Sequence, residues 1–352
     1  MNPVDSRAGG VFYGPVSRGT VTMWLLSALV ALPHAEAAGF QAKTMRAPLS
    51  AVEVERPLVI GKGWLEASFG YDQKLADGSW SPEGEAVAWR SARWLYTTER
   101  IDIRFGLSRS SEFYWHIPFH YVQLHNDALG TDTTGLGIGE PRFGWKLELF
   151  NRAIPTTSIV LDFEYKMPTG QETAGTYVGG PTTVSVFPMS SGQADLSAFV
   201  RGKQQIGPFA IVGGMGYVQR FSGVSQFVVE VDQYQFGGRF KPGSEVRGEL
   251  SPMLQLGPIA LHGDVVYRRW FEGALGTTAG GGFWDENLDL IEGSDGWSVD
   301  AGGGVIVNAT RGVDFLASAS VPIRGEDLTY FPLESLSPTR GVTFSGSVEL
   351  RY

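Results

Sequence analysis

The chain has 352 residues, a formal net charge of −9 and no cysteine, and only 18% of its residues are charged. The negative balance argues against a nucleic-acid partner, and the absence of cysteine excludes disulfides and thiolate metal sites. Its 47 glycines and 12% aromatic residues are typical of an all-β protein with tight turns.

The first recognisable element is an apolar run at residues 21–32. Arg7 and Arg18 precede it, and the small-residue sequence Ala35-Glu36-Ala37 follows it closely. A charged start, a short apolar stretch and an A-x-A site are the parts of a secretory signal peptide. We therefore interpret residues 1–37 as a cleaved signal peptide. The alternative, an N-terminal membrane anchor, is disfavoured because the apolar run is short for a spanning helix.

Alternating apolar and polar residues fill the chain from residue 63 onward. A period of two indicates β-strands, because successive side chains point to opposite faces of a sheet. The clearest runs, 141–149 and 159–167, are joined by a short turn at 151–155 and predict an antiparallel hairpin. The other runs are 64–72, 88–107, 112–124, 194–203, 209–221, 245–256, 259–270, 297–308, 313–322 and 342–352.

One of these runs is irregular. In residues 88–107, Trp94 and Tyr96 fall on the same parity as Arg100, whereas the apolar Ile101 and Ile103 fall on the other. Either a β-bulge near residues 98–99 or a segment at the membrane boundary explains this conflict.

Short and long connections alternate along the whole chain. The short ones are 108–111, 151–155, 205–208, 257–258 and 309–312, and the long ones are 73–87, 125–138, 168–193, 222–244, 271–296 and 323–341. Outer-membrane barrels have short periplasmic turns and long extracellular loops, whereas soluble sandwiches have Greek-key crossovers. We predict an all-β, transmembrane antiparallel up-and-down β-barrel of about 12 strands over residues 63–352, with 10–14 compatible. This places the protein in a Gram-negative outer membrane, in contact with its lipid.

The last strand carries an independent signal. Phe344, Val348, Leu350 and the terminal Tyr352 share one parity. An amphipathic final strand that ends in an aromatic residue resembles the assembly signal of outer-membrane barrels. We therefore expect the barrel-assembly machinery to be a partner through this strand.

In such a barrel the apolar parity faces lipid and the polar parity faces the lumen. We expect lipid contact from Phe143, Trp145, Phe163, Tyr165, Ile211, Leu261, Val305 and Leu350. The candidate lumen-lining residues, which would form a solute path, are Arg142, Lys146, Glu148, Asp162, Glu164, Lys166, Arg201, Lys203, Arg247, Glu249, His262, Asp264, Arg268 and Asp300. Their nearly balanced charges also fit a packed network of ion pairs that fills a narrow barrel. The sequence leaves both interpretations open.

Five glycines share the lumen parity, namely Gly144, Gly214, Gly216, Gly302 and Gly304. They would leave room inside the barrel or let its wall bend. Residues 38–62 show little alternation, and we interpret them as a periplasmic lead-in or as a small plug inside the lumen.

The histidines of the lumen parity, His116, His120 and His262, have no nucleophile at recognisable spacing. We therefore expect no enzyme activity, no catalytic residues, no cofactor and no metal.

Three segments resemble a family of outer-membrane β-barrel transporters named for the MetA pathway of phenol degradation. They are IDIRFGLSRSSEFYWHIPF (101–119), TGLGIGEPRFGWKL (134–147) and FEYKMPTG (163–170). The sequence departs mildly from the family at Gly139-Glu140-Pro141, where Gly-Asp and an apolar residue are expected. The resemblance implies a barrel fold and passive uptake of small solutes, with hydrophobic or aromatic compounds as candidates. The alternative is a non-conducting structural or surface-binding barrel.

Overall fold

The computed structural model describes residues 50, 52–81, 83–88, 92–126, 131–152, 156–168, 176–179, 182–185, 192–231, 234–276, 289–290, 294–310, 312–326 and 340–352. The predicted signal peptide, residues 1–37, lies outside these residues. In the described part of the chain, no helix has the length and apolar character needed to cross a membrane.

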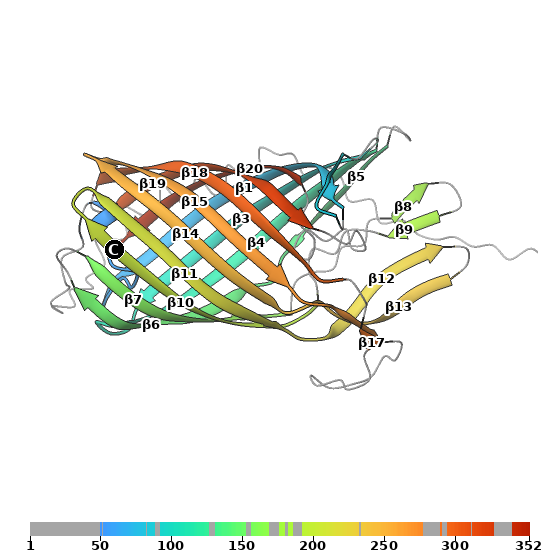
Figure 1. Ribbon diagram of the computed structural model, residues 1–352, viewed down its shortest axis with the longest axis horizontal. Coiled ribbons are helices and arrows are strands. Elements are labelled where there is room, and N and C mark those ends of the chain that lie inside the picture. The colour runs from blue at the N-terminus through green and yellow to red at the C-terminus, as the bar shows by residue number, and fades with distance from the viewer. Residues whose placement is uncertain are drawn as a thin grey trace, which may run out of the picture. The chain divides into compact units, whose positions relative to one another are not determined.

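Twelve antiparallel strands form a closed barrel (Figure 1). Each barrel strand pairs with the barrel strands that precede and follow it along the chain. The first barrel strand also pairs with the last, which closes the ring. The strands are β1 (Leu65–Trp80), β3 (Ala92–Gly106), β4 (Ser111–Asn126), β6 (Arg142–Arg152), β7 (Thr157–Lys166), β10 (Asp195–Ile206), β11 (Phe209–Arg220), β14 (Glu245–Leu256), β15 (Ile259–Trp270), β18 (Gly296–Thr310), β19 (Val313–Glu326) and β20 (Arg340–Arg351). The prediction of a twelve-stranded up-and-down barrel is confirmed.

The strand ends that the five short connections join lie together at one end of the barrel, where the C-terminus also lies (Figure 1). Two of these connections, between β10 and β11 and between β14 and β15, are two-residue turns that begin with Gly207 (φ 59°) and Gly257 (φ 62°). A positive φ at the first turn residue matches the twist of the flanking strands and favours glycine.

The long connections contain further strands, which corrects the expectation that these segments are loops. They are β2 (Ala86–Ala88), β5 (Thr131–Ile138), β8 (Thr176–Gly179), β9 (Thr182–Ser185), β12 (Gly223–Val231), β13 (Tyr234–Lys241), β16 (Ala274–Gly276) and β17 (Asp289–Leu290). β2 pairs with β1 and β5 with β4, whereas the other six form a separate sheet.

The irregular run at residues 88–107 forms β3 without a bulge at residues 98–99. Its ladder with β1 is unbroken from the Ala76–Trp94 pair to the Leu65–Phe105 pair, and its ladder with β4 is also continuous. Tyr96 therefore faces the same side of the sheet as Arg100, which is the lumen.

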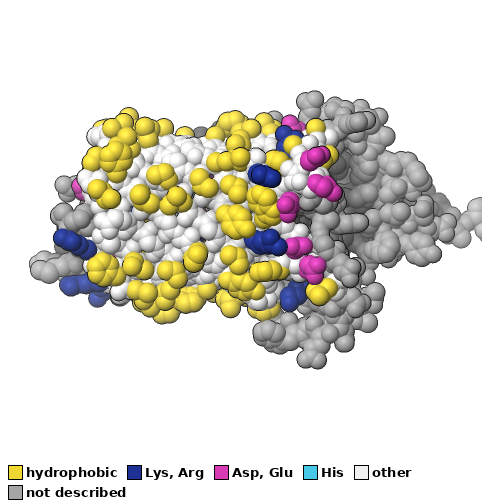
Figure 2. All heavy atoms as spheres, viewed as in Figure 1, with side chains coloured by type: hydrophobic (Ala, Val, Ile, Leu, Met, Phe, Trp, Pro, Cys, Tyr) yellow, Lys and Arg dark blue, Asp and Glu magenta, His cyan; other side chains and the backbone are white. Residues whose placement is uncertain are grey.

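The outer face of the barrel is apolar, and charged side chains gather at its two ends (Figure 2). Four of the eight residues expected to contact lipid are well exposed on this face: Trp145 (47%), Phe163 (43%), Ile211 (47%) and Leu261 (40%). Phe143, Tyr165 and Val305 are partly exposed. Leu350 is only 9% exposed, so the expectation that it lies open to lipid is wrong.

Candidate functional site

All fourteen candidate lumen residues lie on the inward parity of their strands. On β7, for example, Asp162 is buried while its neighbours Phe163 and Ile159 are exposed on the outer face. The fourteen are nevertheless distributed unevenly along the lumen. Most are held in ion pairs or hydrogen bonds against one part of the wall, and only three line a cavity.

Arg201 on β10 ties three strands together in the middle of the lumen. Its guanidinium forms an ion pair with Asp162 on β7, and its Nε lies 2.5 Å from Oε1 of Glu249 on β14. The hydroxyl of Tyr114 on β4 donates a second hydrogen bond to Asp162 at 2.8 Å. The charges of this cluster therefore satisfy one another.

The remaining candidates are also partnered. Arg142 pairs with Glu164 at 3.3 Å, Arg247 with Glu245 at 2.8 Å, and Arg268 with Asp300 at 3.5 Å. Lys166 lies 2.8 Å from Glu140 and 3.0 Å from Asp195. Glu148 accepts hydrogen bonds from Ser158 and Asn151, each at 2.8 Å, and His262 Nδ1 lies 2.7 Å from Asp264.

The lumen glycines do not leave empty space in the way the sequence suggested. The ring of Tyr114 occupies the room beside Gly144, the ring of Phe199 that beside Gly216, and the stem of Arg201 that beside Gly214. Likewise the ring of His262 lies at Gly304. These glycines let a large neighbouring side chain lie flat along the wall. Gly302 differs, because the nearest atoms there belong to Ala319 and Ser320.

At the short-turn end the lumen contains a dense ionic cluster. Glu112 is 0% exposed and accepts hydrogen bonds from Arg104 at 2.9 Å and from Lys146 at 2.9 Å. Arg104 also donates to Glu66 at 2.6 Å, and Glu66 in turn accepts from Arg351 at 2.5 Å. Buried charges of this density persist only when each has partners.

Residues 52–60 lie inside this end of the barrel. Val54 is 1% exposed and packs against the inward-facing Ala210 and Met253 on β11 and β14. The Arg56 guanidinium forms an ion pair with Asp314 on β19, and both side chains are at most 5% exposed. Apolar burial and a paired charge thus hold the same short segment to different strands.

Four hydrogen bonds to its backbone extend these contacts around the barrel. Lys203 on β10 donates to the carbonyl of Glu53 at 2.8 Å, and Thr156 donates to that of Glu55 at 2.7 Å. Arg104 on β3 donates to the carbonyl of Leu58 at 3.1 Å, and Glu112 on β4 accepts from the amide of Ile60 at 2.8 Å. The segment therefore crosses the mouth from β10, β11 and β14 to β3 and β4.

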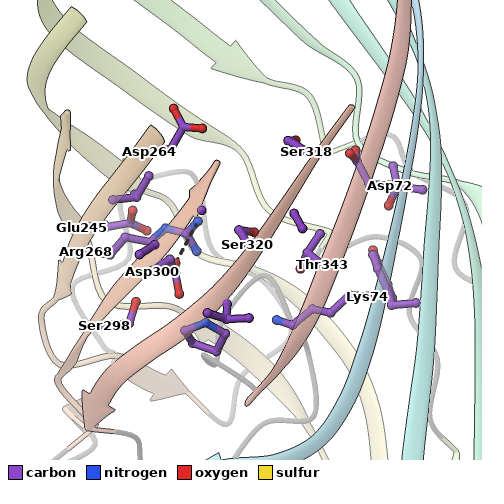
Figure 3. Close-up of a pocket in the computed structure, with 18 of the residues that line it drawn as sticks. Asp72, Lys74, Glu245, Asp264, Arg268, Ser298, Asp300, Ser318, Ser320 and Thr343 are labelled. Atoms are coloured by element: carbon purple, nitrogen blue, oxygen red, sulfur yellow. Dashed lines mark ion pairs between the residues drawn. The ribbon is translucent and has the colours of Figure 1, made fainter. Parts of the chain in front are cut away.

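Toward the long-loop end the lumen contains a cavity of about 440 Å³ (Figure 3). From the candidate set it is lined by Asp264, Arg268 and Asp300. Further hydroxyl-bearing and charged residues line it beside apolar ones such as Trp270, and none of them was among the candidate lumen residues. They are Asp72, Lys74, Tyr96, Thr98, Arg220, Glu245, Ser298, Ser318, Ser320 and Thr343.

Two polar atoms of this lining have no hydrogen-bond partner among the residues that the structure describes. They are the Nε of Arg268 and the Oγ of Ser298, which are buried and come from directly paired positions on β15 and β18. Strand parity could have found most of the missed residues, because it places the serines and Thr343 on the inward face. These uncharged residues were missed because the candidate lumen residues were chosen for their charged or titratable side chains.

The three lumen histidines do not form one cluster. His116 pairs with Asp102, His262 with Asp264, and His120 Nδ1 lies 3.0 Å from the Thr98 hydroxyl. Within the described ranges, no three His, Asp or Glu side chains are arranged to hold a metal ion.

No family model and no curated protein matches the sequence. Solved structures do match the fold. The COG4313 outer membrane channel from Pseudomonas putida F1 aligns with a TM-score of 0.63 at 10% identity, over 83% of this chain and 96% of that one. At this identity the likeness establishes the fold alone, which is that of an outer-membrane barrel.

Two further matches have lower scores. The translocator domain of the autotransporter NalP from Neisseria meningitidis has a TM-score of 0.45 at 11% identity, covering 95% of this chain and 97% of that one. The Pseudomonas putida toluene transporter TodX has a TM-score of 0.38 at 10% identity, covering 82% and 88%. Neither score is high enough to support a conclusion about this chain.

Proposed function

We propose that the protein is a channel of a Gram-negative outer membrane that admits small solutes by passive diffusion. The observation that carries this proposal is a closed barrel with an apolar outer face and a polar lumen that encloses a cavity of about 440 Å³. A cavity of this size accommodates a small molecule. The long connections would face the outside and the short turns the periplasm, as in other barrels of this kind.

Small aromatic compounds that carry polar groups are the solutes that the cavity favours. Its lining combines the rings of Tyr96 and Trp270 with the hydroxyls of Ser318, Ser320 and Thr343. An unsubstituted hydrocarbon would leave these polar groups without hydrogen bonds, which disfavours its binding. The family resemblance of the sequence also points toward aromatic compounds.

Residues 52–60 form a plug that closes the short-turn end of this channel. The buried Val54 and the Arg56–Asp314 ion pair hold it, and it contacts six barrel strands on both sides of the mouth, namely β3, β4, β10, β11, β14 and β19. This arrangement also supports the rival function, a barrel that never conducts. The two functions differ in whether release of the plug produces a permeable pore.

Vesicle swelling separates these functions. Substituting Val54→Asp together with Arg56→Ala removes both anchors, and we expect vesicles containing this variant to take up a small neutral solute faster than vesicles containing the unaltered protein. Lys62→Ala changes an exposed residue just beyond the plug and should leave the rate unchanged. Equal, background-level swelling for all three proteins would favour the non-conducting barrel.

A further inference from the structure

Four adjacent strands, β18, β19, β20 and β1, carry a run of small residues on their inward faces near the middle of the lumen, and Asp72 on β1 borders this run beside Ser345. The ladders place Gly302 opposite Ser320, Ser318 opposite Ser345, and Ser347 opposite Gly70. This surface, here called the Gly/Ser wall, consists of Gly302, Gly304, Ser318, Ser320, Ser345, Ser347, Ser68 and Gly70. The ring of His262 lies against Gly304 and the side chain of Arg100 against Gly70, so the open part of the wall is centred on Gly302, Ser318 and Ser320.

The facing part of the barrel carries large side chains at the same positions. Tyr114, Lys146, Asp162, Arg201 and Glu249 project inward from β4, β6, β7, β10 and β14 and are bound to one another or to Glu112. Moving any one of them toward the centre would break a hydrogen bond or an ion pair in a partly buried setting, which is costly.

The cavity reaches the part of the Gly/Ser wall nearest the long-loop end. Its lining includes Gly302, Ser318 and Ser320 and none of the five large residues on the facing side. Figure 3 shows Ser318, Ser320 and Thr343 lining this space beside Asp300 and Arg268, which come from the neighbouring strands β18 and β15. No described residue of β4, β6, β7 or β10 lines this cavity, which therefore lies to one side of the lumen.

We propose that solutes cross the barrel along the Gly/Ser wall, where Ser318 and Ser320 limit their width and contact them directly. This inference rests on the proposed channel function. Serine hydroxyls both donate and accept hydrogen bonds, and the wall carries no charge of its own. It therefore suits small uncharged solutes that bear hydroxyl or carbonyl groups, and Arg142, Lys146 and Arg201 do not line the route.

The absence of cysteine from the chain allows a direct test by single-thiol labelling. Ser320→Cys and Ser318→Cys place thiols on the wall, and Ser197→Cys places one on the inward face of β10, where the serine is only 5% exposed. With a small hydrophilic maleimide, the two wall thiols should react at least about 10-fold faster than the control, because reaction follows thiolate exposure. Similar rates at all three positions would overturn the proposed route.

Conductance provides the second measurement. In a barrel that lacks residues 39–60, a bulky maleimide adduct on Ser320→Cys should reduce the single-channel current to less than half, and the same adduct on Ser197→Cys should leave it unchanged. Replacing Arg142, Lys146 and Arg201 by Gln should leave ion selectivity unchanged. An unchanged current after labelling of Ser320→Cys would overturn the proposed route but not the channel function. A folded deletion variant that carries no current at all would overturn both the channel function and the route.

Discussion

Replacing Phe163 with Arg would place a charge on the lipid-facing side of β7. Phe163 is 43% exposed and lies six residues beyond the start of the strand at Thr157. Six residues span about 20 Å along a strand, or about 15 Å along the axis of a barrel with a tilt of about 40°, within an apolar band about 25 Å tall. The position is therefore near the bilayer midplane, where Arg costs about 2–4 kcal/mol.

Urea titration of the barrel folded into lipid vesicles measures this cost, with the folded fraction read from the faster migration of unheated protein on a gel. We expect Phe163→Arg to lower the free energy of unfolding by about 3 kcal/mol, or about 100-fold in the folding constant. Phe163→Leu controls for loss of the ring. Ser320→Arg adds the same charge on the cavity side and should cost little. A loss as large for Ser320→Arg as for Phe163→Arg would show that the two faces are assigned wrongly.

Two further substitutions test the packing of the lumen by the same titration. Glu112→Gln should cost about 3–5 kcal/mol, because it leaves the Arg104 and Lys146 cations without the buried carboxylate between them; a loss below about 1 kcal/mol would contradict the buried cluster. Gly144→Val should cost about 1–3 kcal/mol by overlap with the Tyr114 ring. Adding Tyr114→Ala should recover part of that loss, and strictly additive losses would place the ring elsewhere.

Strand alternation and connection length were sufficient to predict the barrel. The runs 245–256 and 259–270 coincide with β14 and β15, because inside the membrane one face of each strand must be apolar. The same rule fails where the membrane ends. β1 continues to Trp80, well beyond the expected end at residue 72, and β5 pairs with β4 inside a segment expected to be a loop.

Parity also predicted which residues face inward, but it could not predict which side chains they pair with or how far along the barrel axis they lie. Arg201 reaches Asp162 and Glu249, which are 39 and 48 residues away, and nothing local in the sequence selects them from the other acidic residues. For the same reason the sequence left two interpretations of residues 38–62, a periplasmic lead-in and a small plug. Arg56 meets Asp314 across 258 residues, so only the closed ring brings them together.

The Gly/Ser wall was visible in the sequence but was not recognised there. Ser318, Ser320, Ser345 and Ser347 alternate regularly on the last two strands, and such small polar residues look unremarkable in any half-polar strand. Their importance depends on the closure between β20 and β1, which joins them to Ser68 and Gly70 on the first strand.

Single-channel recording in a planar lipid bilayer tests the central claim most directly. The intact protein and a variant that lacks residues 39–60 are compared, and faster gel migration of unheated samples shows that both are folded. The account predicts that the intact barrel is largely closed, because residues 52–60 cross its mouth, and that the deletion variant carries a steady current. A folded deletion variant without current would contradict the claim that this barrel is a channel.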